Sequence, residues 1–405
     1  MCNMKLNVLK IKNIYKSLLL SILITLIIAG IIYYAVISHL IGNISEKVGY
    51  VERFDKTENG NFFALFYGKI RHSSGREDLL FRIKIDYKRT SEWGYFPTRF
   101  FAWGIEQVAY CSANLKKLIL VDYKSKKEVY CKQMPEEIEY ISVNKERNVF
   151  VIATQKGLYL LKSQPASKNK ESSANNSFIL KQVAKGSFCW PVLSPDGRYI
   201  ACGENDNKEN ELATSLVVID LNKNIKKKLL SERFGDLPIN NVYRIIYSIA
   251  WSRDSRYVAI STTTPADPAC IWVSVADVLT GKITEFTKNT GLCNPPGCFT
   301  SEDKFIFSQG EPQYKGFGDY STIKEPFRAK LVFLDFKRGN LEFIEETSKD
   351  LNAYWPIYVN GEVYFLDKNS FLTSEGCTIY KLEGKTVKRL FKVNGNLVNY
   401  DIIKN

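Results

Sequence analysis

The sequence predicts an all-β protein: a single β-propeller of seven blades, preceded by one N-terminal transmembrane helix. Three observations lead to this fold class. An uncharged apolar run lies near the N-terminus, the rest of the chain is rich in strand-forming residues, and a turn-and-strand unit recurs along it. We therefore expect a basic cytoplasmic tail over residues 1–16, the transmembrane helix over 17–41, and an extracytoplasmic β-propeller over 42–405.

The apolar run from Ser17 to Ile41 contains no charged side chain. As a helix it is long enough to cross a hydrocarbon core of about 30 Å. A cleaved signal peptide is the alternative, but its apolar region is usually about 7 to 15 residues and ends in a small-residue cleavage site. This run is longer and ends in bulky residues, so we expect an uncleaved anchor that contacts membrane lipid.

The charges that flank the run predict its orientation. Four lysines and no acidic residue precede it: Lys5, Lys10, Lys12 and Lys16. The first charges after it, Glu46 and Lys47, balance each other. Because the more basic flank stays in the cytoplasm, we expect a single-pass protein of the cell membrane, with its N-terminus cytoplasmic and its C-terminal domain extracytoplasmic.

The composition favours strands in that domain. The chain holds 23 Tyr and 24 Phe beside many Val and Ile, and such side chains pack well on a pleated surface. Apolar residues make up 45% of the chain, enough for a sizeable core.

A repeated unit predicts how these strands are organised. The segment 194–201, SPDGRYIA, matches 252–259, SRDSRYVA, almost residue for residue, and 144–151 and 300–307 are weaker copies. Each copy reads as a polar hairpin turn that leads into an apolar strand.

The spacing of the unit predicts blades. The expected second strand of each unit begins near Phe62, Gln107, Val149, Tyr199, Tyr257, Phe305 and Val363. Intervals of about 40 to 60 residues suit four-stranded propeller blades. Six or eight blades are alternatives, because the first unit, 48–95, is irregular. Two β-sandwiches are another, but the near-constant period favours a propeller, closed by pairing of the C-terminal run 397–403 with strands in 48–67.

Three segments carry a resemblance to known repeats. The turn 194–199, its copy 251–254 and the turn 275–282 resemble the TolB-like and WD-like propeller repeats, most clearly across residues 140–310. The resemblance implies the fold more than the function, because such propellers serve as scaffolds, ligand binders and enzymes.

Few residues suit catalysis or a metal. His39 belongs to the membrane run, so His72 is the one histidine left, which excludes a site with two histidine ligands. We predict no catalytic residue and no dedicated metal site. The acidic segment 204–211 has enough oxygen ligands for Ca²⁺, but its spacing is not that of an EF-hand loop, and a solvated hairpin tip is the better interpretation.

Binding residues are expected on the face that carries the long loops and at the mouth of the central channel. Trp190 and Trp355 each precede a proline at the start of an innermost strand. They are suited to stack on a sugar or anchor a peptide, although they also suit gaps between blades. The further candidates are Glu204, Asp206, Asp267, Tyr314, Asp319 and Tyr320.

Nine cysteines are present, and Cys2 is expected in the cytoplasm, which leaves an even number outside, where disulfides persist. Cys293 and Cys298 flank the turn sequence NPPG and are the predicted disulfide. The other strand cysteines suit small buried positions.

These observations favour a membrane-tethered extracytoplasmic propeller that acts as a protein, peptide or glycan binding scaffold. A hydrolase or lactonase-like enzyme, with a carboxylate-bound metal at the central channel, is the alternative. The net charge is +13, and without the four lysines of the cytoplasmic tail +9 remains for the exterior domain. This basic excess suits an anionic surface such as lipid headgroups, an envelope polymer or an acidic protein partner. Nucleic acid is not expected, because the charges are spread along the chain and lie outside the cytoplasm.

Overall fold

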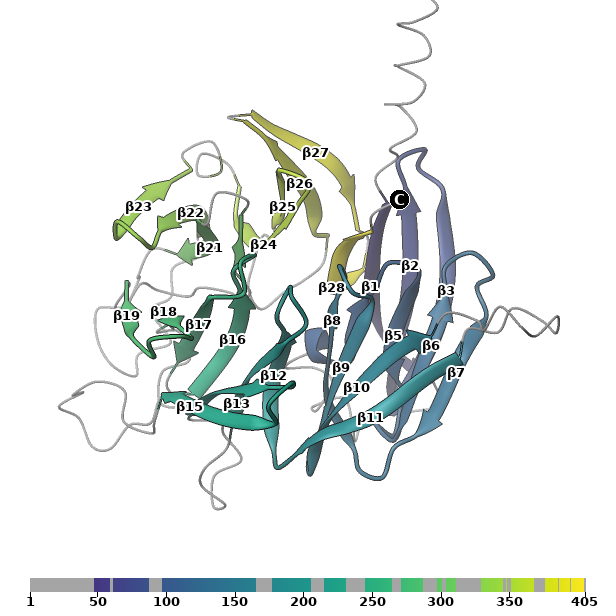
Figure 1. The fold of residues 1–405 in the computed structure, drawn as a ribbon. Coiled ribbons are helices and arrows are strands. Elements are labelled where there is room, and N and C mark those ends of the chain that lie inside the picture. The colour runs from purple at the N-terminus through teal and green to yellow at the C-terminus, as the bar shows by residue number, and fades with distance from the viewer. Residues whose placement is uncertain are drawn as a thin grey trace, which may run out of the picture.

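The computed structural model contains seven four-stranded antiparallel sheets arranged around a central axis, as Figure 1 shows. The residues that it describes are 47–58, 61–86, 97–164, 177–204, 215–230, 245–263, 271–286, 297–300, 304–310, 329–344, 347, 351–367, 376–384, 386–393 and 395–403. The predicted all-β propeller of seven blades is confirmed. The predicted transmembrane run lies outside the described residues, and none of the helices within them has the length and apolar character to span a bilayer.

In each blade the strands follow one another outward from the axis. A short 3₁₀ helix, η1 (Pro97–Phe100), leads into blade two. Blade two consists of β4 (Phe101–Trp103), β5 (Gln107–Cys111), β6 (Lys117–Asp122) and β7 (Glu128–Gln133). Blade three consists of β8 (Ile138–Asn144), β9 (Val149–Thr154), β10 (Gly157–Gln164) and β11 (Ser177–Lys185). Blade four consists of β12 (Phe188–Leu193), β13 (Tyr199–Glu204), β14 (Ser215–Asp220) and β15 (Ile225–Leu230).

The next three blades repeat this order. Blade five consists of β16 (Ile245–Trp251), β17 (Tyr257–Thr263), β18 (Ile271–Asp277) and β19 (Ile283–Glu285). Blade six consists of β20 (Cys298–Phe299), β21 (Phe305–Gly310), β22 (Ala329–Asp335) and β23 (Asn340–Phe343). Blade seven consists of β24 (Ala353–Val359), β25 (Glu362–Asp367), β26 (Thr378–Glu383) and β27 (Thr386–Lys392).

Blade one joins the two ends of the chain. Its order is β28 (Asn396–Ile403), β1 (Lys47–Glu58), β2 (Asn61–His72) and β3 (Glu77–Asp86). Strand β28 pairs antiparallel with β1, with Ile403 opposite Lys47. The predicted pairing of the C-terminal run is therefore confirmed. Phe62, however, lies in the third strand of its blade and not the second, because blade one takes its first strand from the C-terminus.

The turns between first and second strands explain the repeat found in the sequence. In 194–199 the Ser194 hydroxyl donates to Asp196 (2.6 Å) and accepts from the amide of Tyr199 (2.8 Å). The turn 252–257 makes the same two bonds. Because a serine and an aspartate satisfy the turn backbone in both blades, the sequence repeat reflects one hydrogen-bonding pattern.

A second pattern recurs between third and fourth strands. The third strands of four blades end in an aspartate: Asp122, Asp220, Asp277 and Asp335. In each case the carboxylate accepts hydrogen bonds from amides of the following turn. Four residues later each turn has a residue at positive φ: Lys126, Asn224, Gly281 and Gly339. This pattern fixes four tight outer turns.

The alternating strand directions give the propeller two different faces. Turns from first to second and from third to fourth strands meet one face, which we name the terminal face because β1 begins there at Lys47 and β28 ends there at Ile403. Connections from second to third strands and between blades meet the other, the long-loop face. Four polar connections on that side are 205–214, 231–244, 264–270 and 311–328.

The core lies between neighbouring blades. Buried apolar side chains from β17 and β18 pack against those from β21 and β22. A buried polar contact crosses from blade two to blade one, where the Trp103 indole N–H donates to Asn399 Oδ1 at 2.7 Å. Strand-forming aromatic and β-branched residues thus hold the ring together from blade to blade.

Candidate functional site

The third residue of several innermost strands is aromatic. Tyr140, Trp190 and Trp355 occupy this position in β8, β12 and β24. The pairing register of each strand shifts at or beside that residue, which indicates a β-bulge. Bulges redirect side chains out of the regular pleat. The inner strands therefore present aromatic residues at equivalent places around the axis, towards the long-loop face.

Two of these residues have an unusual backbone. Trp190 has φ 51° and Trp355 has φ 53°, and each precedes a proline. Positive φ is uncommon for a bulky side chain, and a following proline restricts the residue further. Such a conformation costs roughly 1–3 kcal/mol and is concentrated at functional sites.

Trp190 belongs to a group built by three blades. Its ring lies 5.1 Å from that of Tyr140 on β8, and the Arg99 guanidinium of η1 lies 5.5 Å from the Tyr140 ring. Burial raises the pKa of Tyr140, and the charge of Arg99 opposes that rise. The tyrosine therefore stays neutral, and the group presents aromatic rings beside one fixed cation.

The environment of the neighbouring thiol disfavours its reactive form. Cys189 precedes Trp190 on β12, and burial raises the pKa of its thiol. A cysteine reacts as its thiolate, which a raised pKa makes less abundant. The backbone partner of Cys189 is Gly203 rather than Cys202.

Trp355 belongs to a second group on the other side of the ring. Its ring lies 5.5 Å from that of Tyr400 on β28, edge to face. The Tyr400 hydroxyl donates to the Trp355 carbonyl oxygen, and burial raises the pKa of Tyr400. The carbonyl oxygen of the bulge has no partner in the strand pairing, and this hydrogen bond satisfies it.

Both tryptophans remain partly exposed while they also pack between blades. Trp190 packs against a buried cluster of blades four and five, and Trp355 packs against one of blades seven and one. Each of these side chains can therefore fill a gap between blades and still stack on a ligand with its exposed part. A half-exposed indole with a fixed orientation suits a sugar face or a peptide side chain.

The other predicted site residues are only partly described. Glu204 ends β13, and its carboxylate lies 2.6 Å from Lys226 Nζ. Asp206, Asp267, Tyr314, Asp319 and Tyr320 lie outside the described residues, as does Cys293. The predicted binding roles and the Cys293–Cys298 disulfide therefore stay predictions.

Charged side chains elsewhere pair in ion pairs. His72 is the last residue of β2, where its Nε2 lies 2.8 Å from an oxygen of Asp78 and its side chain is mostly buried. Within the described segments, no three His, Cys, Asp or Glu side chains come together in a way that suits a metal ion.

Sequence reasoning missed Arg99 and Tyr140. Tyr140 shares the third position of an inner strand with both tryptophans, so an alignment of the inner strands would have found it. Arg99 lies on a 3₁₀ turn between blades, for which the repeat gives no equivalent.

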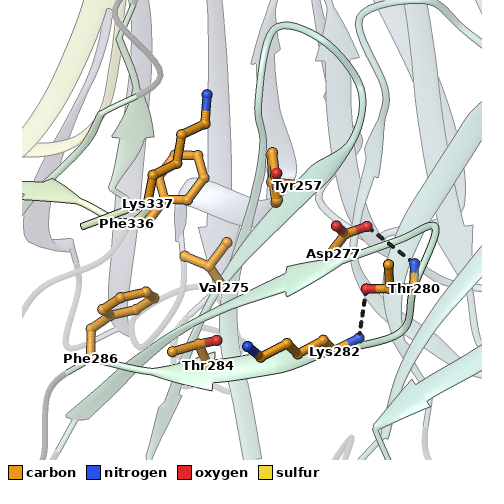
Figure 2. Close-up of a pocket in the computed structure, with 9 residues that line it drawn as sticks. All are labelled: Tyr257, Val275, Asp277, Thr280, Lys282, Thr284, Phe286, Phe336 and Lys337. Carbon is orange, nitrogen blue, oxygen red and sulfur yellow. Dashed lines mark hydrogen bonds between the residues drawn. The ribbon is translucent and has the colours of Figure 1, made fainter. Parts of the chain in front are cut away.

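A cleft of about 340 Å³ lies between blades five and six on the terminal face. Figure 2 shows Tyr257, Phe286 and Phe336 around Val275, with Lys282 and Lys337 among the lining residues. The rings of Tyr257 and Phe336 are 4.9 Å apart. Asp277 is held by Arg256, at 2.8 Å from its Nη2, and the two lysines are further charged residues of the lining.

No protein-family model matches the chain, and no curated protein matches it in sequence. Solved structures resemble it in fold. A periplasmic gluconolactonase of Pseudomonas aeruginosa has a TM-score of 0.51 at 11% identity, over 89% of this chain and 99% of that one. A putative TolB of Agrobacterium tumefaciens has a TM-score of 0.44 at 12% identity, over 68% and 92%.

A WD40 domain of Toxoplasma gondii coronin has a TM-score of 0.43 at 12% identity, over 74% of this chain and 71% of that one. The similar structures thus include both kinds of propeller whose repeats the turns resemble. At these identities the likeness concerns the fold alone.

Proposed function

We propose that this chain is a membrane-tethered extracytoplasmic scaffold that binds a protein, peptide or glycan on its long-loop face. The observation that carries the proposal is the backbone of Trp190 and Trp355, which hold positive φ before proline in equivalent inner strands. Packing alone does not require a bulky residue in that conformation twice. The strain fixes two partly exposed indoles towards the same end of the ring.

The residues around Trp190 limit the chemical classes of ligand that fit this group. The Arg99 guanidinium lies 4.6 Å from the Phe100 ring and 5.5 Å from the Tyr140 ring, so its position is fixed. A cation beside aromatic faces suits an acidic sugar or a peptide with an aromatic and an acidic side chain. Rigid groups of this kind lose little conformational entropy on binding.

The tether is supported by the uncharged run 17–41 and its lysine-rich flank. Because β1 begins at the terminal face, a helix that precedes it leaves the long-loop face directed away from the membrane. A binding surface directed outward is accessible to an envelope polymer or to another protein.

The test measures binding of the full-length protein in detergent to arrays of neutral and acidic oligosaccharides and to peptides displayed on phage. We expect Trp190→Ala and Arg99→Ala to weaken the selected ligand at least about tenfold, as for an anchor residue. Phe343→Ala and Arg253→Ala are the matched controls, because both residues are exposed and lie elsewhere.

Equal loss of binding in the controls, or no effect of Trp190→Ala and Arg99→Ala on any ligand found, would contradict the proposal. Hydrolysis of a sugar lactone that stops on removal of Ca²⁺ would instead support the enzyme alternative. That assay uses the same preparation, so the two functions are compared directly.

A further inference from the structure

We infer that the terminal face lies on the membrane surface and binds anionic lipid headgroups through the basic tips of its turns. The inference rests on the proposed tether and goes beyond it, because an anchored domain need not touch the bilayer. Five features of the chain support it: the linker, the turn charges, the apolar tips, the cleft and the contrast with the other face.

The linker is short. The apolar run ends at Ile41 and β1 begins at Lys47 on the terminal face. Six residue steps span at most about 22 Å even when fully extended. The start of β1 is therefore confined near the headgroups, and this face is the part of the propeller next to the bilayer.

The tips of the turns on this face are basic. The turns that the structure describes throughout hold thirteen Lys or Arg and four Asp or Glu. Exposed examples from blade two are Lys124 and Lys127, and from blade four Lys223. Blade six adds Lys337 and Arg338. Because these blades lie on different sides of the ring (Figure 1), the whole face carries the charge.

The carboxylates at the ends of the third strands lie one layer deeper than the turn tips. The aspartates that end the third strands accept hydrogen bonds from turn amides, as Asp122 does from Ser125 (2.7 Å). Asp220 and Asp277 are also paired with Arg198 and Arg256. Basic groups therefore outnumber carboxylates at the tips of these turns, and an anionic surface attracts them.

Apolar side chains lie among these lysines. Among the large apolar side chains that the structure describes, Leu279 and Ile225 are the most exposed, at 67% and 56%. Leu279 belongs to the outer turn of blade five and Ile225 begins β15 of blade four. Lys227, two residues after Ile225 on β15, donates from Nζ to the Leu279 carbonyl oxygen at 3.4 Å, so the tips of the two blades are neighbours. Apolar residues ringed by lysines are typical of surfaces that enter the headgroup region.

The cleft between blades five and six opens on the same face. Lys282 and Lys337 line it beside Phe336. A volume of about 340 Å³ is at the lower end of ligand sites. It suits a phosphorylated headgroup, with Lys282 beside the phosphate.

The long-loop face differs in charge. The four long connections there contain nine acidic and six basic residues in the sequence. The described turns of the terminal face are therefore more basic than these four connections. An anionic lipid surface attracts the basic face and repels the acidic one, and it therefore also orients the propeller.

The test uses the full-length protein in lipid nanodiscs of phosphatidylcholine, with and without phosphatidylglycerol. Lysine acetylation is measured by mass spectrometry at Lys223 and Lys282. Lys156 is the internal control, since it lies in a turn of the long-loop face with 75% of its side chain exposed. We expect phosphatidylglycerol to slow labelling of Lys223 and Lys282 about threefold or more relative to Lys156, and high salt to remove the effect.

Two variants sharpen the result. Leu279→Asp should restore labelling of Lys282 in the anionic discs, whereas Phe343→Asp, at an exposed apolar residue at the other end of β23, should not. Unchanged labelling of Lys223 and Lys282 in discs that do contain the protein would overturn the inference and leave the tether intact. Protection seen only in native membranes would assign the face to a protein partner and overturn it too. Failure of the chain to enter discs would overturn both the inference and the tether.

Discussion

At the residue scale, the carboxylate of Asp78 shows how the propeller uses its charges. Lys126 Nζ lies 2.8 Å from one oxygen, and His72 Nε2 (2.8 Å) and Arg76 (3.2 Å) contact the other. Lys126 comes from blade two, so the ion pair joins neighbouring blades. Hydrogen bonds from Lys126 and His72 lower the pKa of Asp78 to about 2.

This pKa predicts a pH dependence of stability. Because the folded pKa is below the unfolded value of about 3.9, the ionised carboxylate stabilises the fold above that pH and loses its contribution as the pH falls towards 2. Asp78→Asn should therefore be less stable than the wild type at neutral pH, and the difference should shrink below about pH 4. Urea unfolding over this range measures it. A difference that is constant with pH would contradict the assignment.

Gly339 allows a test of one turn residue. It has φ +76°, and an added Cβ would meet nothing within 4 Å. Gly339→Ala should lower the free energy of unfolding by about 1 kcal/mol, from backbone strain alone. Gly339→Asn is the control and should cost less, because asparagine adopts positive φ more readily. Urea unfolding of the wild type and the two variants measures these free energies. An alanine variant as stable as the wild type would contradict the predicted backbone strain.

At the residue scale the sequence predicts turns better than sites. The serine and aspartate of 194–199 act within a few residues, so their hydrogen bonds follow from the local sequence. Tyr140, Trp190 and Arg99 come from three blades, and only the closed ring brings them together. Trp190 was predicted from its proline and its place in the repeat, but its positive φ was not.

At the element scale, β28 is the strand on which ring closure depends. It pairs with β1 from Lys47 to Arg53, and its Asn399 accepts the buried Trp103 N–H of blade two. The sequence predicted this pairing because an apolar run remained after the last repeat. The sequence analysis placed Phe62 in a second strand. Blade one takes its first strand, β28, from the C-terminus, so the N-terminal part of the chain begins with the second strand and Phe62 lies in the third.

Deletion of residues 396–405 should therefore destabilise the whole ring. The loss of one strand's hydrogen bonds and apolar contacts amounts to several kcal/mol, against a total of about 5–15. Deletion of 404–405 alone is the matched control, because these residues follow the end of β28. Thermal unfolding of both is the measurement. A larger truncation that melts within a degree or two of the control would show that β28 does not close the ring.

At the scale of the whole molecule, the membrane orientation is the prediction with most consequences. A reporter fused after residue 405 should be active outside the cytoplasm, and an N-terminal tag should stay inside, because the lysines precede the apolar run. Protease added to intact cells should digest the C-terminal domain and spare the tag. The reverse protection pattern would contradict the orientation, and with it the outward direction of the long-loop face.

The number of blades was predictable because the repeat is nearly constant along the chain. The difference between the two faces was not, since the lysines of the terminal face are scattered in sequence. Lys124, Lys223 and Lys337 gather on one side only when seven sheets close into a ring.

Because blade one is shared between the two chain ends, it is completed only at the end of biosynthesis. The N-terminal segment leaves the ribosome first, while β28, which completes its sheet, is made last. Until the final residues have been made, β1 has an open edge and can pair with another chain. We expect the newly made domain to depend on chaperones during that interval, and its maturation to begin only on release of the finished chain.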